Sequence, residues 1–302
     1  PSQQNWQPYN SLKKPGQMRA QSYQTVAHGA DTIQFFQLRR SVGGCEKFHG
    51  AVIAHAGTAD TRVFCEVTQL GKELEKIGSR VMGSENHAKV GIIFDWENYW
   101  ALEYTSGPNR DLRYVDQIEQ MYNYFYNKNI AVDMIPIDAD FSKYDLVAAP
   151  VLYMVKDGVA ESLEAYVQAG GTLITTYMSG IVGQSDNVHL GGYPGPLRKM
   201  AGVWVEEIDA LAPEQRNKIR FADGTEEECR LVCDLMHLEG AEEIAQYESD
   251  FYAGMTAVAK NRFGKGTVYY VGTDLSESGL AKVLAMAADG AAIQPVIGEA
   301  TA

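Results

Sequence analysis

The residues best suited to chemistry in this sequence are aromatic and titratable side chains near its start. Trp6 lies in the segment NWQP, Phe36 in QFFQ, and Glu46 and His49 in EKFH. A sugar pocket needs flat apolar surfaces for the C–H faces of a pyranose ring, together with carboxylate and imidazole groups that hydrogen-bond its hydroxyls. These four residues supply both kinds of group, which makes them candidates for a carbohydrate site.

A purely structural role is the alternative for the same residues. In this alternative, Glu46 and His49 only brace a long loop, and Trp6 belongs to a packed core. Single charged residues on loops are common, so residue types alone favour the structural alternative.

The elements that must position these residues follow the order helix, strand, long loop, helix. We expect a helix over 15–27, a short and mostly buried strand in DTIQFFQLRR (31–40), and a second helix over about 60–77. A glycine-rich loop, SVGGCEKFHGAVIAHAG (41–57), precedes the second helix. This order is typical of the end of a β/α barrel, whose active-site loops follow the carboxyl ends of the strands.

A polar, turn-like segment at 78–87 is the expected junction to a second domain. Beyond it, apolar strands alternate with helices. The expected strands are KVGIIFD, AVDMIPI, YDLVAAPVLYMV and GTLITTYM, and the expected helices are DLRYVDQIEQMYNYFYNKN and GVAESLEAYVQAG. This alternation predicts a mostly parallel sheet with helices on both faces, as in a flavodoxin-like domain.

After residue 200 the pattern is weaker. VWVEEI, CRLVCDLM and TAVAK are expected to be strands of an insertion or an edge, and FGKGTVYYVGTDLSESGLAKVLAMAA predicts a glycine turn, a buried strand and a final helix.

Composition excludes some classes of partner. The net charge of −13 argues against nucleic acid and anionic membranes, and no apolar run is long enough to span a bilayer. The first residues lack the features of a signal peptide. The four cysteines fit no zinc-binding spacing and indicate a reduced, cytoplasmic protein; they are Cys45, Cys65, Cys229 and Cys233.

Two further motifs admit both a functional and a structural interpretation. DWENYW (Asp95–Trp100) follows the first strand of the second domain, where α/β domains place ligands. It either contacts a ligand or a neighbouring subunit's pocket, or forms a packed corner, which its aromatic residues favour. LGGYPGPLR (190–198) lacks the GxxxxGK pattern and is expected to be a loop set by turn chemistry.

Several long segments resemble the family 42 glycoside hydrolases, which are β-galactosidases. They are NWQPYN, PGQMRAQSYQTVAHGADTIQFFQLRRSVGGCEKFHGAV, IIFDWENYWALE, LEAYVQAGGTLITTYMSGIV and HLGGYPGPLR. The resemblance extends from Pro1 to about Ala285 with the segments in the family's order. Leu38 departs from the family, in which FFQW is more common, and this puts one aromatic wall of the pocket in doubt.

The resemblance implies a retaining hydrolase that removes terminal non-reducing β-D-galactose. Two glutamates on a TIM barrel would act as acid/base and nucleophile, through a covalent galactosyl-enzyme. It also implies a homotrimer. Residues 1–80 would be the C-terminal segment of the TIM-barrel catalytic domain, 88–288 a flavodoxin-like (class I glutamine amidotransferase-like) trimerisation domain, and 289–302 a linker to a missing small β domain.

The resemblance also assigns the site residues. Trp6, Glu46 and His49 resemble residues that contact galactose, and Phe36 is a weaker candidate. Glu46 is not the expected nucleophile, because it follows the eighth strand whereas the nucleophile of this clan ends the seventh. The family nucleophile belongs to a segment resembling ME-x-x-PS-x-x-NW, which places it about three residues before Pro1. The acid/base and the family's zinc cysteine cluster would lie farther upstream, so we expect no catalytic residue, metal or other cofactor in this chain.

Alternatives to a β-galactosidase piece remain open. One is a non-catalytic module that trimerises, and another is a partner of a separately encoded barrel half. A thiol nucleophile of the amidotransferase kind is not expected, because LVAAPVLYMV ends without a cysteine. Both ends of the sequence are abrupt, and we interpret them as candidate cuts. We expect the chain alone to be inactive, because two helices and a strand cannot close an eight-stranded barrel.

Overall fold

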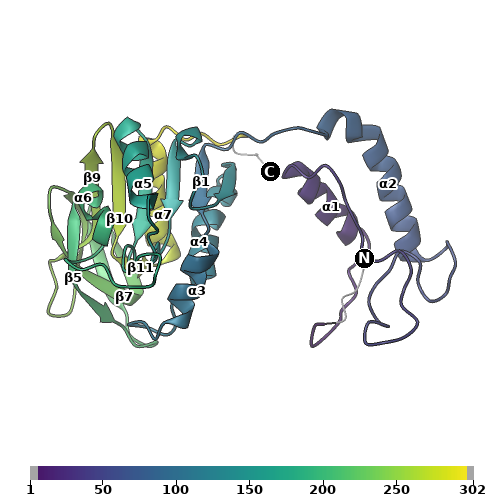
Figure 1. The fold of residues 1–302 in the computed structure, drawn as a ribbon, viewed down its shortest axis with the longest axis horizontal. Helices are drawn as coiled ribbons and strands as arrows, with labels where there is room; N and C mark the ends of the chain where they lie inside the picture. Colours follow the sequence, from purple (N-terminus) through teal and green to yellow (C-terminus); the bar gives the residue numbers. More distant parts are fainter. Residues whose placement is uncertain (1–5, 298–302) are drawn as a thin grey trace. The chain divides into compact units, whose positions relative to one another are not determined.

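The computed structural model describes residues 6–297, which divide into two compact units. The division falls between His87 and Ala88, at the end of the segment expected to join two domains. Figure 1 shows the helices and strands of each unit.

The first unit contains two helices, α1 (Gln17–Ala27) and α2 (Arg62–Val81). They are tied together by Glu73 on α2, whose carboxylate pairs with Arg19 Nε at 2.7 Å and accepts a hydrogen bond from the Tyr23 hydroxyl at 3.0 Å. Helix α2 runs four residues past the expected end at Ile77 and so includes the start of the predicted turn-like segment.

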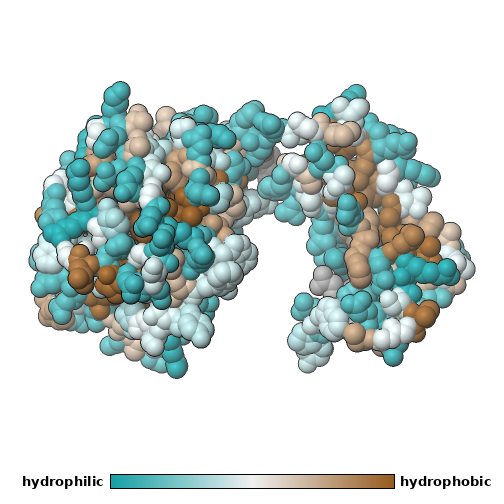
Figure 2. All heavy atoms as spheres, in the orientation of Figure 1, coloured by the Kyte–Doolittle hydropathy of each residue, from teal (hydrophilic) through white to brown (hydrophobic). Residues whose placement is uncertain are grey.

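Few apolar side chains of the first unit are buried. Among its described residues, the buried hydrophobic ones are Met18, Ala51 and Leu70. Figure 2 shows apolar side chains at the surface of this unit. A stable domain needs a larger core, so this unit contributes little stability by itself.

The buried strand expected over 31–40 is absent from the described part of the chain. The segment is irregular apart from one parallel bridge between Arg39 and Ile53, and Phe36 is 62% exposed. A strand is defined by a ladder of hydrogen bonds to a neighbour. Among the described residues of the first unit, this segment can pair only with the short stretch around Ile53. It therefore does not form a strand, although its composition is typical of one.

The second unit is built on one 11-stranded mixed sheet among the described residues. Its parallel part has the order β10-β4-β3-β1-β2. The bounds of these strands are β1 Val90–Ile93, β2 Val132–Ile135, β3 Leu146–Ala149, β4 Thr172–Thr176 and β10 Gly266–Val271. Strands β1, β3 and β4 are buried at every position, as expected for continuous apolar runs covered on both faces.

The rest of the sheet is antiparallel, so the expectation of a mostly parallel sheet is wrong. Its strands are β5 Val203–Ala210, β6 Asn217–Phe221, β7 Glu226–Leu238, β8 Glu242–Tyr247, β9 Thr256–Phe263 and β11 Thr273–Leu275. The sequence did not predict β6, β8 and β11. Strand β6 alternates buried and exposed positions, because an antiparallel strand with one wet face needs no continuous apolar run.

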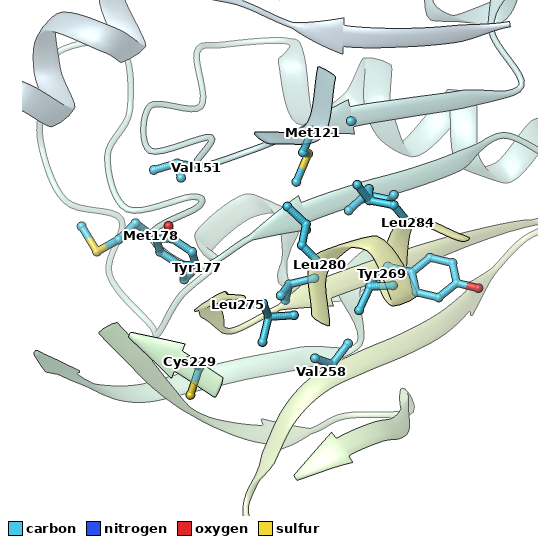
Figure 3. Packing of buried hydrophobic residues seen from close by; sticks show 14 of the residues in the cluster. Met121, Val151, Tyr177, Met178, Cys229, Val258, Tyr269, Leu275, Leu280 and Leu284 are labelled. Carbon is cyan, nitrogen blue, oxygen red and sulfur yellow. The ribbon is translucent and has the colours of Figure 1, made fainter. Parts of the chain in front are cut away.

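Helices cover both faces of the parallel strands, as the alternating pattern predicted. Alternate residues of one strand enter different cores: Ile92 belongs to one cluster and Ile93 to the other. The first cluster packs α4 and α7 against the sheet through residues such as Met121 and Leu284 (Figure 3), and the second packs α5. The helices are α3 Trp96–Tyr104, α4 Tyr114–Asn127, α5 Val159–Ala169, α6 Arg198–Ala201 and α7 Glu277–Gly290, with 3₁₀ turns at Phe141–Lys143 and Gly195–Leu197.

Helix α7 continues to Gly290, two residues into the segment 289–302 expected to be a linker. Val296 still donates a hydrogen bond to the carbonyl of Asn129 at 2.8 Å, so the chain stays attached to the second unit there. Residues 298–302 of the expected linker, and the Pro1-Ser2 pair of the family segment, lie outside the described residues.

Candidate functional site

Three of the predicted sugar-site residues lie together in the first unit. The ring of His49 is 5.7 Å from the ring of Trp6 and 5.8 Å from the ring of Phe36, measured between centroids. Both contacts are edge-to-face, with interplanar angles of 67° and 81°. The sequence brings these rings from three separate segments, so their proximity is a property of the fold.

Backbone hydrogen bonds fix the loop that carries His49. The amides of Val52 and Ile53 donate to the carbonyls of Gln37 and Leu38 at 2.9 and 2.7 Å, which closes both ends of the loop. Arg40 Nε donates to the carbonyl of His49 at 2.7 Å. These hydrogen bonds fix the backbone on both sides of His49, and the fixed backbone positions its imidazole beside Phe36.

The cluster combines a buried polar atom with open apolar rings. His49 is buried, and its Nδ1 has no hydrogen-bond partner among residues 6–297. Trp6 and Phe36 are 63% and 62% exposed. A buried nitrogen without a partner is costly, and a ligand hydroxyl held against the two rings would satisfy it.

Glu46 lies three residues before His49 and is half-buried. Its carbonyl accepts a hydrogen bond from the amide of His49 at 3.0 Å. Within the described chain its carboxylate forms no hydrogen bond or ion pair with the aromatic cluster, so the structure places Glu46 in the same loop without joining its side chain to the three rings. Leu38, at the position where the family more often has Trp, is exposed.

The DWENYW motif forms the start of helix α3. Asp95 caps the helix by accepting a hydrogen bond from the Asn98 amide at 3.0 Å, and it pairs with Lys156 Nζ at 2.8 Å. Burial lowers the pKa of Lys156, but hydrogen bonds to Asp95 and to Glu97 outweigh it and raise the pKa. Lys156 was not predicted from the sequence, because it lies 61 residues after Asp95 and follows another strand.

Buried and exposed parts of this motif point to different roles. The Asn98 side chain is fully buried, donating to the carbonyl of Val151 at 3.0 Å and accepting from the Met154 amide at 2.8 Å. Trp96 and Trp100 are 58% and 60% exposed, with centroids 6.0 Å apart. The motif is thus a packed corner that also presents two tryptophans to the surroundings.

The turn after β3 shows why a thiol nucleophile is not expected in the second unit. The strand ends at Ala149, well before the end of the predicted LVAAPVLYMV strand, because Val151 turns the chain with a left-handed φ of 45°. A strained turn after a strand is where some α/β enzymes carry their nucleophile. Here the side chain is that of a fully buried valine, which cannot act as one.

The glycine-rich loop 190–198 is held by its own geometry. Gly191 and Gly192 have φ of 106° and 95°, and Arg198 closes the loop by donating to the Gly191 carbonyl. The guanidinium also forms a bidentate pair with Glu239 at 2.6 Å. Because Glu239 neutralises the positive charge of Arg198, this arginine gives no support to a phosphate-binding role for the loop.

No three His, Cys, Asp or Glu side chains within residues 6–297 are grouped so that they could hold a metal ion. Over the same residues, none of the helices combines the length and apolar character required to cross a membrane.

Comparison with known proteins identifies the chain. The family model described as β-galactosidase trimerisation domain matches residues 88–294, and the model described as β-galactosidase matches residues 1–77. Fold and matches together define a glycoside hydrolase chain. It belongs to glycoside hydrolase family 42, which confirms the resemblance of its motifs.

Relatives show how much of such a protein is present. The chain is 54% identical over 283 residues to the β-galactosidase LacZ of Lactobacillus acidophilus, covering 94% of this chain and 42% of that protein. It is 52% identical to the β-galactosidase BgaA of a Planococcus species, covering 98% and 45%. The crystal structure of a Bacillus circulans β-galactosidase matches with a TM-score of 0.96 and 48% identity, over 99% of this chain and 45% of that one. The chain thus spans less than half the length of these relatives.

Proposed function

We propose that this chain is the part of a retaining β-galactosidase that contacts the sugar and assembles the subunits. The single observation that carries the proposal is the aromatic cluster, in which Trp6 and Phe36 leave an open apolar surface beside an unsatisfied Nδ1 of His49. Sugar recognition needs this combination of a flat apolar face and a polar group that fixes a hydroxyl.

Each residue has a role in the proposal. Trp6 and Phe36 line the galactose subsite, and His49 donates a hydrogen bond to one hydroxyl. Glu46 accepts hydrogen bonds from galactose hydroxyls, since its carboxylate has no competing partner among the described residues. The nucleophile, about three residues before Pro1, and the acid/base farther upstream would perform the two displacement steps.

In this proposal the first unit is the end of a TIM barrel and the second a flavodoxin-like trimerisation domain. The few buried side chains of the first unit support the former, since a barrel segment needs the remaining strands to bury its apolar residues. The two complete cores of the second unit support the latter. A homotrimeric, cytoplasmic β-galactosidase remains our prediction for the whole protein.

A chimera tests the sugar-site proposal. The part of LacZ from Lactobacillus acidophilus that aligns with this chain would be replaced by residues 1–302, which restores a complete catalytic domain. We expect the chimera to hydrolyse a nitrophenyl β-galactoside and the 302-residue chain alone to be inactive. Turnover by the purified chain alone would overturn the assignment of both catalytic glutamates to upstream segments.

A non-catalytic assembly module is the second candidate function, favoured by the exposed Trp96 and Trp100 on an otherwise well-packed unit. Light scattering of the purified chain measures it directly. A trimer without hydrolytic activity agrees with both candidates, whereas a chimera that trimerises but never hydrolyses would leave only the assembly role.

A further inference from the structure

Strand β7 carries two cysteines, Cys229 and Cys233, four positions apart. In a regular strand this spacing separates the Cα atoms by about 13 Å. Such a distance is far too long for any direct reaction between the two side chains.

An irregularity in β7 shortens this distance. On the neighbouring strand β11, Cys229 is paired with Leu275 and Cys233 with Thr273. Four steps along β7 therefore match two steps along β11, and the register shifts between them. The extra residues are accommodated at Leu231, whose φ is 63°, as in a β-bulge.

The bulge brings the cysteines within reach of each other. Residues two steps apart on a strand are separated by about 6.8 Å and share one face of the sheet. Cα atoms of disulfide-bonded cysteines lie roughly 4.4–6.8 Å apart. Cys233 Sγ lies 3.7 Å from Thr273 Oγ1, on the side that faces β11.

The two thiols also influence each other's ionisation. The interaction with its neighbour lowers the pKa of Cys233 and raises that of Cys229. One proton is thus shared between the sulfurs when the pair ionises, which favours a thiolate next to a thiol.

A cavity gives a small reagent a route to one member of the pair, Cys229. It has a volume of about 680 Å³, and Cys229 forms part of its wall together with Arg230, Leu275 and Ser276. Both cysteines are otherwise buried, so a peroxide-sized molecule can reach Cys229 more readily than a bulky disulfide such as oxidised glutathione can.

We propose that Cys229 and Cys233 form a redox-modification site that peroxide converts to a disulfide within β7. One sulfur, as thiolate, attacks a peroxide oxygen; the O–O bond breaks, giving a sulfenic acid and, with the released proton, water. The second sulfur then displaces hydroxide, which leaves as water with the second thiol proton. In balance, two thiols and one hydrogen peroxide give one disulfide and two waters.

The sequence around the pair allows a direct test. Trypsin cleaves after Arg230, between the two cysteines, and releases the peptides 221–230 and 231–260. The folded 302-residue chain would be treated with hydrogen peroxide, alkylated in denaturant and digested without reductant. We expect the two peptides to remain joined with the loss of two hydrogen atoms, and reductant to separate them.

Exposed cysteines serve as internal controls in the same digest. Cys45 and Cys65 lie in the peptides 41–47 and 63–72, and we expect neither to become linked to a β7 peptide. Cys229→Ser and Cys233→Ser should each abolish the linked species. Separate β7 peptides in the peroxide-treated wild type, whether alkylated or overoxidised, would overturn the proposal, and this result does not depend on the folding of any variant.

Discussion

Asp234 on β7 is a buried carboxyl group whose replacement should stabilise the second unit. Its side chain accepts a hydrogen bond from the Tyr270 hydroxyl at 2.7 Å, while Oδ1 has no partner among the described residues. Burial raises the pKa of Asp234 to about 8, and the Tyr270 hydrogen bond opposes this shift only in part. The native state therefore holds a proton that the unfolded chain, with an ordinary pKa of 3.8, releases.

The sign of the pH effect follows from this difference. Between about pH 4 and pH 8 the native state binds more protons than the unfolded state, so wild-type stability falls as pH rises through this window and levels off above it. An asparagine side chain resembles the protonated carboxyl group and does not titrate. We expect Asp234→Asn to be near neutral in effect below pH 4 and to stabilise by ~2 kcal/mol at pH 5 and ~4 kcal/mol at pH 7.

Equilibrium urea unfolding at several pH values, followed by tryptophan fluorescence, measures this effect. Tyr270→Phe is the matched control: it removes the hydrogen bond that favours the ionised form, so the pKa of Asp234 should rise further and the pH dependence should persist. An Asp234→Asn variant whose stability difference from wild type is constant between pH 4 and pH 8 would refute a buried, protonated carboxyl.

Three other predictions concern the sugar site and the DWENYW corner. In the chimera, Glu46→Gln should lower kcat/KM about 10- to 100-fold, the cost of a hydrogen bond to a charged group; azide rescue with an inverted product would instead identify Glu46 as the nucleophile. Lys156→Met leaves the mostly buried Asp95 carboxylate without its ion-pair partner and should destabilise the second unit by about 2–3 kcal/mol in urea unfolding; an unchanged midpoint would contradict this. Trp96→Ala combined with Trp100→Ala should shift light-scattering mass toward monomer without changing the far-UV circular dichroism, if these exposed rings anchor a subunit contact; an unchanged mass would exclude that role.

Much of the second unit could be predicted from local pattern. The runs VGII, LVAA and TLITT carry no charge and are buried at every position because parallel strands are covered on both faces, and this property is visible in a single segment. Strands β6 and β8 carry charges on a wet face. Strand β6 depends on its pairing with β7 and β8, and β8 on its pairing with β6 and β9. The sequence does not show this pairing.

The site shows the same division between residue type and arrangement. Trp6, Phe36, Glu46 and His49 could be chosen by chemistry, but only the fold shows that three of them meet while the Glu46 carboxylate stands apart. The partnership of Lys156 with Asp95 joins two segments with no common motif. The left-handed turn at Leu231 is equally hidden, because leucine has no local preference for it.

Strand β2, at one end of the sheet, has a consequence for handling the protein. Its four residues leave one row of backbone groups without a neighbouring strand in the described chain, and such edges promote intermolecular pairing and aggregation. Asp133 lies in the middle of this strand, where its carboxylate accepts a hydrogen bond from the Tyr144 hydroxyl at 3.0 Å. A charge at the centre of so short an edge opposes the pairing of this strand with a second chain, so its replacement by an apolar residue would remove one barrier to aggregation.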